Sequence, residues 1–243
     1  MFSALKNHPF AVEAHFKRST VLTFAFPKEQ LQSLLPAPLV LDTYDDKYGF
    51  IAVAMVDTKE LRPKGFPKFM GTDFFLVGYR IFVRYTNKDG KNLRGLYILR
   101  SETDKAFMKI LGSLFTHYQY EKINITQTEN NNIETIKSNN FQVALSYKNN
   151  DAALPIHSPF PDWKTARRYA GPLPFTFSID TGKKQVVIVQ GVRKHWIPEP
   201  IEVVDYQFEF LKTMHLDNGI LANAFVINDI PYYWKKGVIE SWK

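Results

Sequence analysis

The sequence predicts a mainly β fold of the α+β class, with one mostly antiparallel sheet system, closed or sandwiched, and a few short helices. Aromatic residues make up 15% of the 243 residues, a content that favours sheets over helical bundles. Apolar runs of strand length recur along the chain and alternate with clusters of turn residues. No repeat, low-complexity segment or break in composition marks a linker, so we expect residues 1–243 to form a single domain.

The N-terminal part predicts two buried strands separated by a short helix. Residues 19–26 (STVLTFAF) are β-branched and aromatic, which indicates a buried strand with Arg18 at its mouth. Residues 27–35 begin with proline and place leucines on one face, as a short helix does. Residues 48–56 (YGFIAVAMV) are continuously apolar, which favours a central strand. Residues 61–71 contain two prolines and two glycines, so we expect an irregular loop of the kind that often borders a site.

The middle of the chain predicts a hairpin and a meander. Residues 74–85 and 93–100 flank the turn sequence Asn-Lys-Asp-Gly, which favours an antiparallel hairpin. Residues 123–147 alternate polar and apolar side chains and contain two asparagine-rich turns, which predicts three short strands.

The hairpin's second strand runs into a polar segment, Arg100-Ser101-Glu102-Thr103-Asp104, and then into a short amphipathic helix. With Asp104 as N-cap, Phe107 and Ile110 belong to a broad apolar face, and Lys109 lies on the opposite, polar face. Arg100 ends an apolar strand and could clamp a carboxylate, while an ion pair with Glu102 or Asp104 is the alternative.

The C-terminal part predicts one more helix and several strands. Asp162 is placed to cap a helix over residues 163–170, which ends at Gly171-Pro172. Further strands are expected at residues 175–179, 184–192, 203–210 and 222–227. The cluster Tyr232-Tyr233-Trp234 is interpreted as core or dimer packing, with the lining of a ligand entrance as the alternative. The sequence leaves open whether the chain forms a homo-oligomer.

Composition excludes several classes of function. The chain has no cysteine, so disulfides, thiolate metal sites and cysteine nucleophiles are excluded, and a reducing cytoplasm suits it. The net charge is +7, but no run of five basic residues occurs, so we expect no nucleic-acid partner. No apolar stretch has the length of a membrane span, and no signal peptide is recognisable. The six histidines have no metal-ligand spacing, so neither a metal nor another cofactor is expected.

Two parts of the sequence resemble a known family. An arginine opens a strand at Arg18, a short helix ends in Leu-Leu-Pro-Ala-Pro-Leu at residues 34–39, and an apolar strand leads to Met-Val-Asp-Thr at residues 55–58. This order resembles the N-terminal part of acetoacetate decarboxylase. Residues 167–172 (RRYAGP) and 196–198 (WIP) look like an uncharacterised bacterial branch of that superfamily. The resemblance implies a mainly antiparallel β cone or barrel that encloses an apolar pocket.

The resemblance also implies candidate site residues. Acetoacetate decarboxylase acts through a lysine that forms a Schiff base, and Lys109 matches that position, although Ile110 stands where a second lysine belongs. Arg18 matches the pocket arginine, and a salt bridge at the end of its strand is the alternative for it. No carboxylate aligns with the family's catalytic glutamate, and Glu60 and Glu102 are the nearby candidates. The candidate catalytic residues are therefore Lys109 and Glu102, and the candidate ligand-binding residues are Arg18 and Arg100.

Two functions follow as expectations. The first is a pocket for a small organic acid or carbonyl compound, with lyase chemistry of the decarboxylase or aldolase-dehydratase type through a lysine if the protein is an enzyme. The alternative is a non-catalytic protein of the same fold that binds a small molecule.

Overall fold

The computed structural model describes residues 2–147, 152–194, 196–216 and 218–242. The helical elements are η1 (Phe2–Asn7), α1 (Lys28–Gln32), η2 (Lys68–Met70), α2 (Ala106–Phe115), α3 (Trp163–Ala170) and α4 (Glu209–Thr213). The strands are β1 (Val12–Pro27), β2 (Val40–Leu41), β3 (Tyr48–Pro63), β4 (Thr72–Thr86), β5 (Asn92–Thr103), β6 (Tyr120–Lys122), β7 (Thr126–Asn130), β8 (Ile133–Lys137), β9 (Phe141–Ser146), β10 (Phe175–Asp180), β11 (Gln185–Arg193), β12 (Glu199–Pro200), β13 (Glu202–Phe208), β14 (Ile220–Trp234) and β15 (Val238–Ser241).

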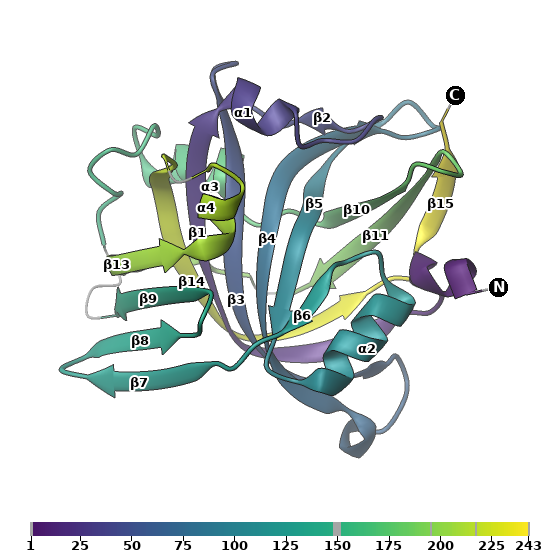
Figure 1. The fold of residues 1–243 in the computed structure, drawn as a ribbon, viewed down its shortest axis with the longest axis horizontal. Helices are drawn as coiled ribbons and strands as arrows, with labels where there is room; N and C mark the ends of the chain where they lie inside the picture. The colour runs from purple at the N-terminus through teal and green to yellow at the C-terminus, as the bar shows by residue number, and fades with distance from the viewer. Residues whose placement is uncertain (1, 148–151, 195, 217, 243) are drawn as a thin grey trace.

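The long strands close into a ring (Figure 1). They follow the order β14, β1, β3, β4, β5, β10 and β11, and β11 then pairs back onto β14, with Gly191 opposite Trp234. Neighbours in the ring are antiparallel except β5 and β10, which are parallel. This closed, mostly antiparallel barrel with a few short helices confirms the fold class predicted from the sequence.

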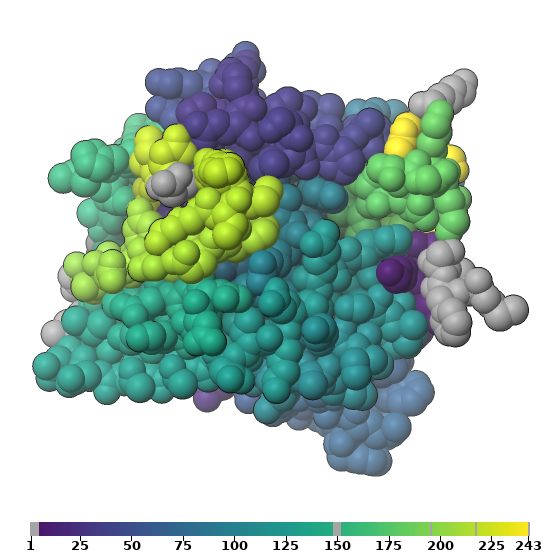
Figure 2. Space-filling model, in the orientation of Figure 1, coloured from purple at the N-terminus to yellow at the C-terminus, as the bar shows by residue number. Residues whose placement is uncertain are grey.

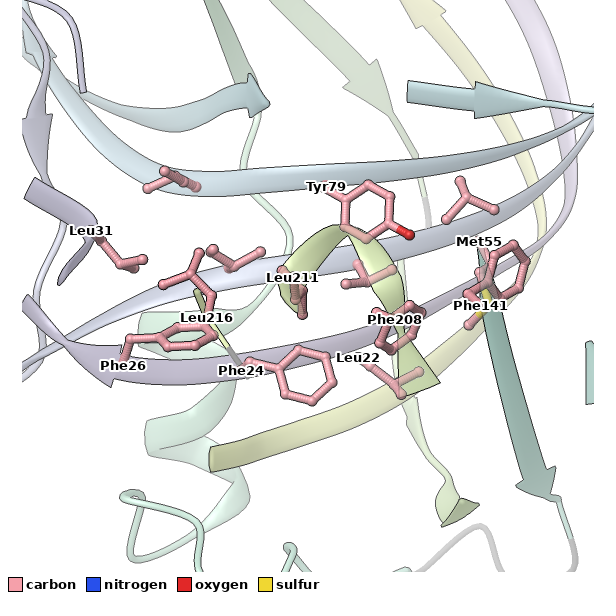
Figure 3. Packing of buried hydrophobic residues seen from close by; sticks show 14 of the residues in the cluster. Leu22, Phe24, Phe26, Leu31, Met55, Tyr79, Phe141, Phe208, Leu211 and Leu216 are labelled. Atoms are coloured by element: carbon pink, nitrogen blue, oxygen red, sulfur yellow. The ribbon is translucent and has the colours of Figure 1, made fainter. Parts of the chain in front are cut away.

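A second sheet, in the order β13, β9, β8 and β7, packs outside the ring. Figure 3 shows Leu22, Met55 and Tyr79 of the ring facing Phe208 and Leu211, which come from the end of β13 and from α4. On the face drawn in Figure 2, the second sheet, α4 and α2 cover ring strands. Because the central strands are buried on both faces, their sequences are continuously apolar rather than alternating.

Most elements lie where the sequence predicts them. Asp162 caps α3, since its carboxylate accepts a hydrogen bond from the backbone nitrogen of Thr165 at 2.7 Å. The hairpin of β4 and β5 turns at Asn-Lys-Asp-Gly, and the predicted meander is β7, β8 and β9. The loop expected at residues 61–71 is shorter, because β3 extends to Pro63.

The predicted cap and buried face of α2 are wrong. Asp104 does not cap the helix; its carboxylate accepts a hydrogen bond from the backbone nitrogen of Phe75 at 2.8 Å, which fastens the end of β5 to β4. Phe107 and Ile110 are 52% and 66% exposed. The helix turns a different face inward, with Met108 buried, because its neighbours η1 and β6 lie on that side.

Within the described residues, no helix is long and apolar enough to span a bilayer.

Candidate functional site

The ring encloses a cavity of about 410 Å³. Every strand of the ring contributes side chains to its wall, and α2 closes one side with Met108, Leu111 and Phe115. The wall is mostly apolar and aromatic. Among the described residues that line it there is no aspartate, glutamate, asparagine, glutamine or lysine. A cavity of this size and lining is typical of small-molecule sites.

Arg80 of β4 is the charged residue that stands out in this wall. It lies deep in the barrel, with part of its surface open to the cavity. Its Nε has no hydrogen-bond partner, and no ion pair with Arg80 exists within the described part of the chain. Burial lowers the pKa of Arg80, while the hydroxyls of Tyr232, Tyr118 and Tyr120 act in the opposite direction. Arginine nonetheless keeps its proton in proteins, so Arg80 supplies an uncompensated positive charge.

A glycine makes room for the Arg80 guanidinium. A Cβ atom at Gly78, two residues earlier on the same face of β4, would lie 2.8 Å from Arg80 Nε and 3.1 Å from Nη2. The arginine side chain therefore folds back along its own strand, over Gly78.

The two other arginines in the wall are engaged within the protein. Arg62 forms an ion pair with Glu13 at 2.8 Å and donates to the Phe66 carbonyl oxygen at 2.9 Å. Arg193 donates to the Pro172 carbonyl oxygen at 3.1 Å, and its guanidinium lies 4.0 Å from the ring centre of Trp196. Arg80 is thus the arginine of this wall for which the described part of the protein supplies neither an ion-pair partner nor an acceptor for Nε.

The tyrosines near Arg80 can donate hydrogen bonds. Burial raises the pKa of Tyr118, and it raises the pKa of Tyr120 to about 12. Both hydroxyls therefore carry their protons at neutral pH. Tyr232 and Trp234 also line the cavity. For these two residues, the structure agrees with the alternative to core or dimer packing, namely that they line the space for a ligand.

The structure places the four predicted site residues outside the cavity wall. Arg18 forms an ion pair with Glu134 of β8, and Arg100 forms ion pairs with Glu121 and, at 3.0 Å, with Glu102. Lys109 is exposed on α2. The structure brings Arg100 and Glu102 together but leaves Arg18 and Lys109 apart from them. Their predicted catalytic and binding roles remain predictions.

Glu102 is fully buried between β5 and the second sheet. Desolvation raises the pKa of its carboxyl group, which accepts a hydrogen bond from Asn140 Nδ2 at 2.9 Å. The ion pair predicted as the alternative role for Arg100 is therefore the arrangement that the structure contains.

Two register shifts explain why Arg18, Arg100 and Glu102 face outward. On β5, Leu96 and Ile98 face the cavity, but the register against β4 shifts at Leu99, so Ser101 faces inward next. A β-bulge of this kind moves the following side chains to the opposite face. On β1 the register against β3 shifts between Phe16 and Arg18, and the inward positions become Ser19 and Val21.

Sequence reasoning missed Arg80. A signal existed, because Arg80 interrupts the apolar run Phe74–Phe82 at a position in phase with Phe74 and Phe82. A lone cation amid apolar residues of a strand is rarely buried without a partner.

No group of three or more histidine, aspartate or glutamate side chains in the described ranges is arranged to hold a metal ion. His195, one of the six histidines, lies outside the described residues.

Comparison with known proteins identifies the family. A family model described as an uncharacterized conserved protein (DUF2071, COG2071) matches residues 13–229. The chain belongs to the DUF2071 family. No curated protein sequence matches this DUF2071 chain.

Solved structures share the fold at low sequence identity. Acetoacetate decarboxylase from Legionella pneumophila superposes with a TM-score of 0.61 at 10% identity, over 96% of this chain and 88% of that one. An acetoacetate decarboxylase-like enzyme from Sphingomonas wittichii RW1 superposes with a TM-score of 0.60 at 12% identity, over 98% of this chain and 96% of that one. The enduracididine biosynthesis enzyme MppR superposes with a TM-score of 0.59 at 9% identity, over 98% of this chain and 91% of that one. That structure is complexed with the condensation product of pyruvate and imidazole 4-carboxaldehyde. The resemblance to the acetoacetate decarboxylase superfamily is confirmed as a shared fold.

Proposed function

We propose that the protein binds a small organic acid in the barrel cavity, with the acid's carboxylate on Arg80 and its apolar body against the aromatic wall. A single observation carries the proposal: a buried guanidinium without an ion-pair partner among the described residues faces a cavity of about 410 Å³.

The energetics of a buried cation support an anionic ligand. A charge removed from water without a partner is strongly unfavourable, and a carboxylate compensates it through paired, charge-assisted hydrogen bonds. The hydroxyls of Tyr118 and Tyr120 supply further donors near the same point. The apolar wall adds affinity in proportion to ligand length, at about 0.8 kcal/mol for each buried methylene group.

The same geometry favours non-covalent binding over Schiff-base chemistry. A Schiff base needs a lysine within reach of the bound carbonyl, and the described residues that line the cavity contain none. The role predicted for Lys109 would require its exposed amine to reach the ligand, and borohydride trapping with acetoacetate tests that step directly.

Titration calorimetry with linear carboxylates of increasing length tests the proposal. Nonanoate should bind, and Arg80→Met should weaken its binding at least about thirtyfold, or roughly 2 kcal/mol. The neutral isostere nonanamide should bind wild type and Arg80→Met equally, which separates loss of charge from loss of fold. Arg167→Met, which removes an exposed arginine from α3, is the matched control and should leave nonanoate binding unchanged. Equal binding of nonanoate to wild type and Arg80→Met would overturn the proposal.

A further inference from the structure

Two more polar atoms of the cavity wall have no hydrogen-bond partner within the described part of the protein: Thr58 Oγ1 and Trp196 Nε1. Thr58 lies on β3 and is 1% exposed. Native proteins pair nearly all their buried polar atoms, so unpaired atoms around one cavity indicate that a ligand completes them.

Several polar side chains of the cavity wall are hydrogen-bond donors. The Arg80 guanidinium and the Trp196 indole donate and cannot accept. Tyr118 and Tyr120 carry their protons at neutral pH. Since the unpaired nitrogen atoms of Arg80 and Trp196 can only donate, and the described lining contains no carboxylate to pair with them, the wall suits a ligand that accepts hydrogen bonds.

The register of the barrel sets the spacing between the Arg80 and Thr58 sites. The guanidinium lies over Gly78, which is opposite Ala54 of β3. Thr58 is four residues further along β3, or about 13 Å at the usual rise per residue. A carboxylate carbon lies about 4 Å from the guanidinium carbon it pairs with, which leaves about 9 Å to Thr58. A hydrogen bond to Thr58 spans about 2.8 Å, so the accepting oxygen of the ligand would lie about 6 Å from its carboxylate carbon.

The wall around Thr58 is aromatic. Thr58 is opposite Phe74 on β4 and opposite Phe16 on β1. The Phe16 ring stacks on Tyr232 with their centres 4.8 Å apart. A ligand oxygen near Thr58 would therefore contact this hydroxyl in apolar surroundings. There a hydrogen bond discriminates strongly between ligands that carry the oxygen and ligands that lack it.

We infer that the ligand carries a second oxygen, an acceptor of the ether or carbonyl type, which lies about 6 Å from its carboxylate carbon and accepts a hydrogen bond from Thr58 Oγ1. This inference rests on the proposed function and specifies its ligand as an elongated acid with one distal acceptor.

A pair of isosteric probes tests the inference. Nonanoate and 5-propoxypentanoate have the same number of chain atoms and differ by one methylene replaced with an ether oxygen, which accepts but does not donate. Wild type should bind the ether at least as tightly as nonanoate. Thr58→Val keeps the side-chain shape, and it should weaken the ether about tenfold relative to nonanoate, because the buried oxygen loses its donor.

Each outcome of this calorimetric comparison is decisive. The inference is overturned if the ratio of the dissociation constants for the ether and for nonanoate is the same in Thr58→Val as in wild type. It is also overturned if Trp196→Phe changes that ratio and Thr58→Val does not. In both cases nonanoate binding by wild type leaves the proposed function standing. If neither acid binds wild type, the proposed function itself fails. Nonanoate binding by Thr58→Val also reports that the variant is folded.

Discussion

The position of the Arg80 guanidinium depends on the missing side chain of Gly78. A methyl group there would approach Arg80 Nε to 2.8 Å, closer than real Cβ contacts, so the guanidinium would have to move. Because the end of an arginine side chain is flexible, we expect Gly78→Ala to fold and to melt close to wild type. Its affinity for nonanoate should fall about tenfold, since the displaced guanidinium can no longer form two parallel hydrogen bonds with the carboxylate.

Gly182→Ala is the matched control for this prediction. A Cβ at Gly182 meets one atom, Asp180 Oδ1, at an ordinary 3.5 Å. Calorimetry on both variants decides the question: unchanged nonanoate affinity in Gly78→Ala would mean that the guanidinium does not set the affinity.

At the scale of the elements, the positions of the strands were predictable, but the face of the sheet on which each side chain lies was not. Apolar runs and turn residues are local features, so they located β1, β3, β4 and β5 and the three strands of the meander. The direction of a side chain depends on pairing, and the shift at Leu99 exists only when β4 and β5 are aligned. Arg100 and Glu102 are in phase with Leu96 in the sequence, yet they face the second sheet rather than the cavity.

The second sheet is attached to the ring by polar contacts as well as by its apolar core. Arg18 of β1 pairs with Glu134 of β8, and Glu102 of β5 accepts a hydrogen bond from Asn140, which lies between β8 and β9. Glu102 is fully buried, whereas Glu134 also accepts from the Tyr147 hydroxyl at 2.8 Å. The junction at Glu102 should therefore respond to pH.

Desolvation raises the pKa of Glu102 above its ordinary value of 4.5, so the folded protein binds this proton more tightly than the unfolded chain does. The stability that the group contributes is complete below the unfolded pKa and is lost as pH rises through the folded pKa. Glu102→Gln keeps an acceptor for Asn140 and does not titrate. The free energy of unfolding of wild type minus that of Glu102→Gln should therefore decrease between pH 4 and pH 7 in urea titrations.

Glu129→Gln, which removes an exposed carboxylate on β7, controls for the change in net charge. A stability difference between wild type and Glu102→Gln that grows with pH would show that the ion pair with Arg100 outweighs desolvation.

For the whole molecule, closure of the barrel creates the cavity, and closure depends on contacts that are distant in sequence. β11 pairs with β14 in antiparallel orientation, and β10 pairs with β5 in parallel orientation. Neither pairing leaves a local signal in the sequence. The mainly β class followed from composition, and the barrel followed from the resemblance to acetoacetate decarboxylase. The cavity wall could not be derived in the same way, because it combines side chains from every strand of the ring.

A ligand enclosed by the whole ring should stabilise the whole fold. Nonanoate that binds the folded barrel and not the unfolded chain, at 100 times its dissociation constant, adds about 2.7 kcal/mol to the free energy of unfolding. For a chain of this length the melting temperature should rise by about 5–10 °C. In Arg80→Met, binding weakened thirtyfold puts the same concentration at only about three dissociation constants, which adds about 0.9 kcal/mol, so the rise should fall to about a third of the wild-type rise or less. Calorimetric melting of both proteins checks this, and an equal rise in both would show that Arg80 does not hold the carboxylate.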